Sequence, residues 1–164
     1  MNFILRPWHA DDADDLVRYA DNPEIAKNLR DAFPHPYTME NAVSFIGMAA
    51  KSPSIFAIEI EGHACGGIGL HPQQDIYRLN AEMGYWLGQP FWGHGIITEA
   101  IARMVEFGFA HLPVDRIFAV PFGSNTASQR VLEKNGFVLE AHLYHTIIKN
   151  GRLEDELIYA VRRK

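Results

Sequence analysis

The stretch QPFWGHGIITEA at residues 89–100 decides how this chain folds, because it joins a strand pattern to a helix pattern. Before it, Arg78–Leu87 has the two-residue periodicity of a strand. After it, apolar residues recur at helical spacing over Ile96–Phe109. Gly93 and Gly95 stand at the junction, where glycine lets the backbone turn sharply and come close to a ligand. The sequence therefore predicts a strand, a tight glycine turn and an amphipathic helix.

Similar patterns on both sides of this stretch complete the expected order of elements. Further strands are expected at Phe3–Arg6, Ser54–Ile60, His63–Leu70, Arg116–Val120, Phe137–Lys149 and Arg152–Val161. Glycines 66, 67 and 69 indicate a bulge or a close backbone approach in the strand at His63–Leu70. Asn150-Gly151, between the last two strands, predicts a type I′ turn. Further helices are expected from Asp11 or Asp12, which offer N-caps, to Ala20, and at Glu24–Leu29 after a break at Asn22-Pro23. Two more are expected after Thr38, which should cap its helix, and at Thr126–Asn135, with Gly136 as the C-terminal cap. This order predicts an α/β fold with a mixed, mostly antiparallel, twisted sheet flanked by helices. Residues 1–164 are expected to form a single domain.

Composition excludes several classes of protein. The net charge is −5, and no lysine or arginine cluster is dense enough to predict a nucleic-acid partner. No run approaches the roughly 18 apolar residues of a membrane span, so no membrane partner is expected. Cys65 is the single cysteine, which excludes an internal disulfide and fits a reducing compartment. With no signal-peptide pattern at the start of the sequence, the expected location is the cytoplasm.

The glycine turn has a chemical interpretation as well as a structural one. The first turn of a helix leaves amide groups unpaired, and the helix dipole favours an anion such as a pyrophosphate there. The alternative is a plain turn. The stretch lacks the full glycine pattern of a dinucleotide-binding module, which remains a weaker alternative. Asn125, at the next strand-to-helix junction, is expected either to cap the following helix only or to bind a ligand as well.

Several motifs together resemble the GNAT N-acetyltransferase superfamily, in particular its RimJ/RimL-like branch. They are LRP at 5–7, PYT at 36–38, AEMGYWL at 81–87, WGHG at 92–95, Asn125 with Ser128, and GF at 136–137. The resemblance covers nearly the whole chain. It implies central strands that splay apart and acetyl-CoA as the acetyl donor bound between them.

The resemblance also assigns residues to the donor. The backbone of Trp86–Gly88 is expected to pair with the pantetheine arm, Asn125 to contact it, and Ser128 to lie near the thioester sulfur. The amides of residues 92–98 are expected to hold the pyrophosphate. The complete predicted set is Trp86, Leu87, Gly88, Trp92, Gly93, His94, Gly95, Ile96, Ile97, Thr98, Asn125 and Ser128.

Three positions depart from the superfamily pattern. Pro90 stands where Gln or Arg is usual, but backbone amides are expected to do the holding. Leu132 stands where many members carry a tyrosine general acid, so Ser128 is the candidate acid. Ile147 stands where RimL-type enzymes place a catalytic glutamate, so the usual base of that subgroup is missing.

Glu82 is the candidate base, because it lies on the strand that leads to the donor site. Its alternative role is a structural ion pair. The expected reaction is direct attack of a primary amine on the thioester in a ternary complex. The missing tyrosine and glutamate leave a second hypothesis, a non-catalytic protein of the same fold that binds or senses acyl-CoA.

The acceptor has no decisive motif. It is expected to be a protein N-terminal amine or a small-molecule amine, and the predicted acceptor residues are Phe33, Tyr37, His71 and His145. No metal is expected, since His142 and His145 should point to opposite faces of their strand. The oligomeric state is left open between a monomer and a homodimer.

Overall fold

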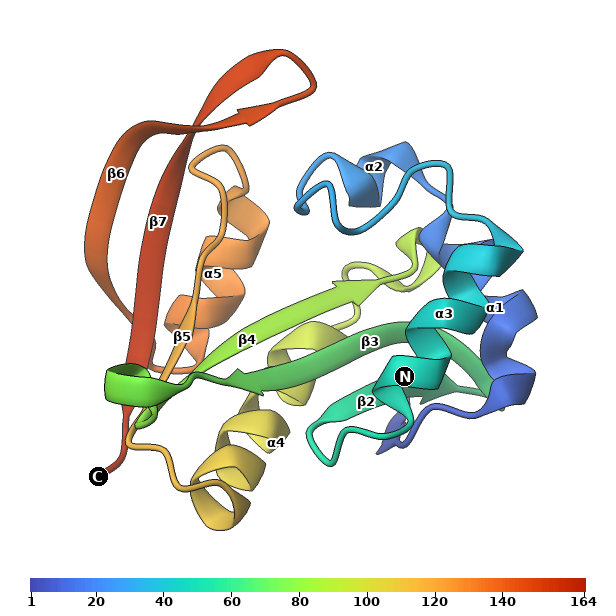
Figure 1. Ribbon diagram of the computed structural model, residues 1–164, viewed down its shortest axis with the longest axis horizontal. Helices are drawn as coiled ribbons and strands as arrows, with labels where there is room; N and C mark the ends of the chain where they lie inside the picture. Colours follow the sequence, from blue (N-terminus) through green and yellow to red (C-terminus); the bar gives the residue numbers. More distant parts are fainter. The chain divides into compact units, whose positions relative to one another are not determined.

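A computed structural model describes residues 1–164. Figure 1 shows its helices and strands coloured along the chain. Contacts between residues divide the chain into two compact units. The first unit comprises residues 1–69 and 85–100, and the second comprises residues 70–84 and 101–164.

Seven strands form one sheet in the order β1-β2-β3-β4-β5-β7-β6. They are β1 (Ile4–Arg6), β2 (Ile55–Ile60), β3 (His63–Pro72), β4 (Asn80–Leu87), β5 (Arg116–Ala119), β6 (Val138–Lys149) and β7 (Arg152–Arg162). β4 and β5 run parallel, whereas β1 and β2, β2 and β3, β5 and β7, and β6 and β7 pair antiparallel. The predicted mixed, mostly antiparallel sheet is confirmed.

Five α-helices and three short 3-10 turns connect the strands. The helices are α1 (Ala13–Ala20), α2 (Pro23–Ala26), α3 (Met39–Ala49), α4 (Ile96–His111) and α5 (Thr126–Lys134). The turns are η1 (Ala10–Asp12), η2 (Asp75–Tyr77) and η3 (Gln89–Phe91). The prediction extended α2 to Leu29, but the chain tightens after Ala26, where Leu29 donates to a carbonyl three residues back. β4 starts two residues later than predicted, since η2 precedes it.

The core of the first unit lies where α1 and α3 pack together over the strands. Trp8 is 2% exposed and meets Phe45 of α3 edge-on, with ring centroids 5.3 Å apart. Leu16 of α1 and Ile46 of α3 are buried in the same cluster. Thr38 caps α3 as predicted, because its hydroxyl accepts the amide of Asn41 at 3.2 Å.

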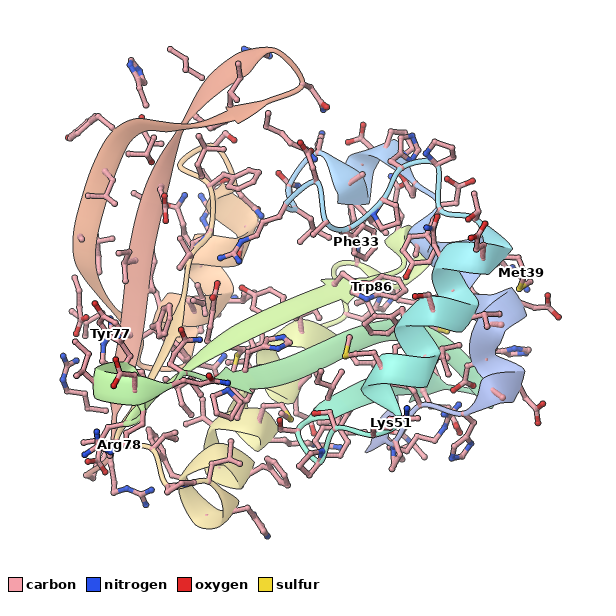
Figure 2. All side chains as sticks on the ribbon, in the orientation of Figure 1. Phe33, Met39, Lys51, Tyr77, Arg78 and Trp86 are labelled. Carbon is pink, nitrogen blue, oxygen red and sulfur yellow. The ribbon has the colours of Figure 1, made fainter.

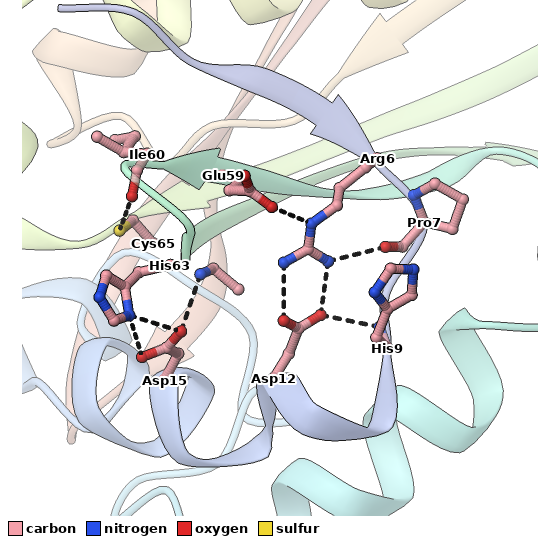
Figure 3. Close-up of polar contacts among 10 residues, drawn as sticks. Arg6, Pro7, His9, Asp12, Asp15, Glu59, Ile60, His63 and Cys65 are labelled. Carbon is pink, nitrogen blue, oxygen red and sulfur yellow. Dashed lines mark hydrogen bonds and ion pairs between the residues drawn. The ribbon is translucent and has the colours of Figure 1, made fainter.

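Arg6 of β1 ties the start of the chain to its neighbours (Figure 3). Its guanidinium donates two hydrogen bonds to Asp12, each 2.8 Å long, and a third to Glu59 of β2. Asp12 also accepts the amide of His9 at 2.8 Å. The expectation that the Asp12 side chain caps α1 is therefore wrong, because the arginine and the preceding amide occupy both carboxylate oxygens.

Glycines in β3 allow a close backbone approach within the first unit, as predicted. A Cβ on Gly66 would lie 2.6 Å from the carbonyl oxygen of Trp86, and one on Gly67 would lie 2.8 Å from the Trp86 indole nitrogen. A side chain at either position would push the Trp86 segment away. Ile58 and Glu59 of β2 pair with Gly66 and Ala64, which leaves Cys65 as the extra residue of a bulge in β3.

In the second unit, β4 pairs with β5 over a short ladder. The register joins Asn80, Ala81 and Glu82 to residues 116–118, and β4 then continues without further paired positions in that register. The predicted splay of the central strands is confirmed. α4 packs closely here, since a Cβ on Gly108 would lie 2.7 Å from Leu70.

The C-terminal part of the second unit is a long hairpin beside α5 (Figure 1). Asn150 and Gly151 both have positive φ, 51° and 74°, as the predicted type I′ turn requires. Tyr159 of β7 donates to Glu133 of α5 at 2.9 Å. α5 thus lies along β7.

Candidate donor and acceptor sites

The glycine turn between β4 and α4 has the predicted geometry. Gly93 and Gly95 have φ of +79° and +75°, backbone angles that residues with a Cβ rarely adopt. A Cβ at either position would meet nothing within 4 Å, so backbone conformation, and not lack of space, requires glycine. α4 begins at Ile96, directly after the turn.

The start of α4 presents amide groups that the helix itself does not use. The first hydrogen bond of the helix is from the Glu99 amide to the Gly95 carbonyl, at 3.1 Å. The amides of Ile96 and Ile97 lie ahead of it. Since α4 is 16 residues long, its dipole adds positive potential at this end. The turn and the helix start together form a candidate pyrophosphate site.

The backbone at the end of β4 is less open than the resemblance implied. The Gly88 amide donates to the Cys65 carbonyl at 2.7 Å. The Leu87 carbonyl accepts the indole N–H of Trp92, also at 2.7 Å. Because an indole N–H seeks an acceptor, the nearby carbonyl holds it. A pantetheine amide that used the Leu87 carbonyl would have to share it with Trp92 or displace the indole.

Asn125 caps α5, which was the structural one of its two predicted roles. Its side-chain oxygen accepts the amide of Ser128 at 3.2 Å. The cap uses the oxygen, so the NH₂ group is the part of the side chain suited to donate to a ligand. Ser128 lies in the first turn of the same helix. The two predicted residues are brought together on the second unit.

Three predicted residues of the first unit form one aromatic cluster. The ring of Phe33 lies 5.1 Å from that of Tyr37 and 5.8 Å from that of Trp86, between centroids. Figure 2 shows Phe33 and Trp86 close together. Tyr37 is only 4% exposed, and burial raises its pKa to about 12. Phe33, which is less buried, is therefore the better candidate to touch an acceptor.

The first unit has a surface hollow, lined mostly by residues with polar side chains, that the sequence did not predict. It has a volume of about 400 Å³ and is lined by Arg18, Tyr19, Asp21, Asn22, Gln89 and Pro90. The Asn22 side chain donates to that of Gln89 at 2.8 Å, which joins the α1–α2 segment to the segment after β4. The sequence identified Asn22 only as a helix boundary, and no local pattern predicts its partner 67 residues away.

The two predicted acceptor histidines lie in the second unit, and one expectation about them is wrong. His71 is exposed near the end of β3, and its carbonyl accepts the side chain of Gln73. His145 has a φ of +52° inside an irregular part of β6. His142 and His145 do not point to opposite faces, since their Nε2 atoms lie 2.8 and 4.0 Å from the same carboxylate, Asp155.

A β-bulge explains the convergence. Leu143 pairs with Glu156 and Ile147 with Glu154, so three residues of β6 face Asp155 alone on β7. The Asp155 carboxylate accepts a hydrogen bond from the His142 ring at 2.8 Å and another from the His145 amide at 3.0 Å. These hydrogen bonds lower the pKa of Asp155, the one from His142 having the larger effect. Regular strand periodicity could not predict this cluster.

The structure shows neither a metal-binding cluster nor a helix that could span a membrane. No group of three histidine, cysteine, aspartate or glutamate side chains is arranged to hold a metal ion. None of the helices combines the length and the apolar character that crossing a bilayer demands.

Comparison with known proteins gives the family. The acetyltransferase (GNAT) domain family matches residues 2–138. This chain belongs to the GNAT acetyltransferase family. Over 165 aligned residues it is 38% identical to the uncharacterized N-acetyltransferase YoaA of Bacillus subtilis, covering 96% of this chain and 92% of YoaA. The protein is thus an acetyltransferase, as predicted.

Solved structures agree with this GNAT assignment. The microcin C7 self-immunity acetyltransferase MccE, in complex with acetyl-CoA and AMP, is 25% identical, with a TM-score of 0.83 over 98% of this chain and 92% of that one. RimL, the ribosomal L7/L12 alpha-N-protein acetyltransferase in complex with coenzyme A, has a TM-score of 0.87 at 20% identity, covering 99% and 94%. The RimJ/RimL-like fold predicted for the chain is confirmed.

The structure shows where the three residues discussed for general acid and base roles, Leu132, Glu82 and Ser128, lie. Leu132 is fully buried in the core, so no side chain at that position of α5 meets a substrate here. Glu82 is half-buried on β4, where it pairs in register with Phe118. Glu82 and Ser128 both lie in the second unit.

Proposed function

We propose that this acetyltransferase moves the acetyl group of acetyl-CoA to a primary amine, with a protein N-terminal α-amine as the acceptor. The observation that carries the donor is the pair of positive-φ glycines at the start of α4, which leaves helix amides facing outward. RimL and MccE, which share the fold, were crystallised with coenzyme A and acetyl-CoA. We place the reaction in a reducing compartment, the cytoplasm, because the single cysteine forms no disulfide.

Each unit carries part of the set of residues proposed for the donor. In the first, residues 92–98 are proposed to bind the pyrophosphate and Trp86–Gly88 the pantetheine arm. In the second, Asn125 is proposed to contact the pantetheine and Ser128 the sulfur. The Trp92 indole donates its N–H to the Leu87 carbonyl, which the pantetheine arm is proposed to use. We therefore expect the environment of the indole to change when acetyl-CoA binds.

The proposed reaction is direct attack in a ternary complex. An amine must be neutral to attack the thioester. At pH 7, deprotonating an α-ammonium with a pKa of about 7.7–8.0 costs about 1 kcal/mol, whereas deprotonating a lysine side chain costs roughly 4–5 kcal/mol. An α-amine therefore suits a site without the usual strong base. A thiol ordinarily ionises near pH 8.5, so the departing sulfur needs little help and a weak acid such as Ser128 suffices.

The main alternative acceptor is a small-molecule amine. The fold neighbour MccE is described with AMP beside acetyl-CoA, whereas RimL acts on a protein N-terminus. The surface hollow in the first unit carries the polar side chains of Arg18, Asn22 and Gln89, which could contact a small acceptor as well as the end of a peptide.

Release of coenzyme A, measured with a chromogenic thiol reagent, tests the proposal. The panel contains a peptide with a free N-terminal α-amine, the same peptide blocked at its N-terminus with one lysine inside, spermidine, and an amino-acid amide. Cys65 is fully buried and burial raises its pKa to about 11, so the native enzyme adds little thiol background. The free peptide is expected to be the fastest acceptor.

Each other outcome has a definite meaning. Faster turnover of spermidine or the amide would replace the protein acceptor with a small amine. Release of no thiol with any acceptor, despite acetyl-CoA binding, would contradict the proposed transfer. Glu82→Gln is included in the panel, because unchanged turnover in that variant would dismiss Glu82 as the base.

A further inference from the structure

The β6–β7 hairpin holds a titratable cluster that the sequence did not predict. At the bulge, Asp155 of β7 binds the His142 ring at 2.8 Å and the His145 amide at 3.0 Å. The positive φ of His145 makes this bend, which places the second ring 4.0 Å from the same carboxylate. A strained non-glycine residue in a strand is a conformation that the surroundings must support.

Asp155 fixes the orientation of one ring in particular. Since Nε2 of His142 faces the carboxylate, Nε2 carries the proton of that hydrogen bond, and Nδ1 is the nitrogen with the lone pair. Tyr144 stacks on the same ring, with centroids 4.1 Å apart and 12° between planes. The His142 side chain stays 36% exposed, so a ligand can reach it. An imidazole that is held through one nitrogen, keeps a lone pair on the other and stays partly exposed is suited to accept a proton.

The cluster lies against the loop that leads to Asn125 and Ser128. The Gly123 amide donates to the Asp155 carbonyl at 2.9 Å, and a Cβ on Gly123 would lie 2.9 Å from the Asp155 Cβ. Ser124 donates to Glu154 at 3.0 Å. Figure 1 shows the hairpin beside α5. The histidine pair is therefore anchored to the same loop that starts the helix proposed to meet the thioester.

Asp155 is the charged group that contacts the His142 ring, and His145 lies near the same carboxylate. Further polar groups of the bulge region are Thr146 of β6, Glu154 and Glu156 of β7, and Ser124 of the β5–α5 loop. Thr146 donates to Glu156 at 3.2 Å, and Ser124 occupies Glu154. This stretch of β7 therefore carries three successive carboxylates, Glu154, Asp155 and Glu156, and negative charge attracts an ammonium group.

We infer that His142, oriented by Asp155, is the base that takes the proton from the acceptor ammonium. This rests on the proposed function and makes His142 the rival of Glu82 for one role. The ammonium gives a proton to Nδ1, and the neutral amine attacks the thioester carbon. The C–S bond breaks, the nitrogen loses its second proton, and one of the two protons ends on the thiolate. The balance is ammonium plus thioester to amide, thiol and one proton released to solvent.

His142→Gln is the test, because glutamine can still donate to Asp155 but has no basic nitrogen. With the free-amine peptide, kcat at pH 7 is expected to fall about 100-fold, the lower end of the range for a general base. The defect should shrink to a few-fold at about pH 9.5, where the α-amine is neutral without help. The acetyl-CoA dissociation constant should stay within about twofold, since a tenfold change would need about 1.4 kcal/mol of lost contacts.

A second histidine–aspartate pair supplies the matched control. His63 of β3 lies 3.1 Å from Asp15 of α1 and is exposed like His142 (Figure 3). His63→Gln removes the same chemical group and should leave kcat unchanged at every pH. Asp155→Asn tests the positioning role. It should give a smaller loss of kcat with the same narrowing at high pH.

Three results would overturn the inference while leaving the proposed function intact. These are full activity in His142→Gln, a loss that is equal at all pH values, and a pH-dependent loss in Glu82→Gln but not in His142→Gln. A wild-type enzyme that acetylates no amine would overturn the proposed function itself, and His142 as its base with it.

Discussion

At the scale of single residues, Asp12 shows how a charged side chain can serve the fold instead of a helix end. Burial alone would raise the pKa of Asp12, but the hydrogen bonds from Arg6 and the His9 amide outweigh it and hold the pKa below its ordinary value. The carboxylate is 8% exposed and Arg6 16% exposed, so the pair is poorly reached by water. Its removal should be felt more than that of a surface ion pair.

Asp12→Asn is therefore expected to lower the free energy of unfolding by about 2 kcal/mol at pH 7, the scale of a hydrogen-bonded charge. Arg6 keeps Glu59 as a partner, which limits the loss. Because the folded pKa is depressed, the stabilisation is present above the ordinary value of 3.8 and disappears as the pH falls below it. Urea unfolding of the wild type and the variant at pH 7 and pH 3 measures the loss of stability and its dependence on pH. Asp11→Asn, at an exposed neighbouring position, is the control. A constant difference at the two pH values would contradict this assignment.

At the scale of elements, the glycine turn before α4 separates a conformational requirement from a binding one. Gly95 and Gly62, in the β2–β3 turn, share positive φ, +75° and +84°, and empty space around the missing Cβ. Alanine at either site is expected to strain the backbone alone, at about 1–2 kcal/mol. The two sites differ in that only Gly95 precedes the helix proposed to bind the pyrophosphate.

Gly95→Ala should weaken acetyl-CoA binding about tenfold or more, since a displaced amide near a phosphate loses about 1.4 kcal/mol or more. Gly62→Ala should lose a similar amount of stability and bind acetyl-CoA normally. Titration calorimetry and urea unfolding of both variants make the comparison. Equal dissociation constants in the two variants would remove the turn from the donor site.

Also at this scale, the elements that local patterns describe were predicted well. Thr38, Gly136 and the Asn150-Gly151 turn act as expected, because caps and tight turns depend on residues a few positions apart. The bulge at His145 was missed, since a strand that carries one irregular φ keeps an ordinary sequence pattern. The hydrogen bond between Asn22 and Gln89 was missed because it depends on tertiary structure alone.

At the scale of the whole molecule, the family was predictable where the acceptor was not. The motifs for the donor combine glycine conformation and helix starts, and both leave traces in sequence. The residues proposed for the acceptor, such as Phe33, and the proposed base His142 stand in segments that share no motif and no fixed spacing in the sequence. Each unit holds part of the predicted set of site residues. The motifs identify these residues in the sequence, but they do not give the distances between the side chains.

The whole chain should therefore respond to the donor as one ligand-stabilised protein. Acetyl-CoA at about 100 times its dissociation constant adds about 2.7 kcal/mol to the stability of the folded state. For a chain of this size that amounts to a rise in Tm of roughly 5–10 °C. NAD at the same concentration should give no rise, because the turn lacks the third glycine of a dinucleotide site. Gly95→Ala, if it binds acetyl-CoA about tenfold more weakly, should lose about half of the acetyl-CoA shift, and Gly62→Ala should keep it. A larger shift with NAD than with acetyl-CoA in differential scanning calorimetry would contradict the donor assignment.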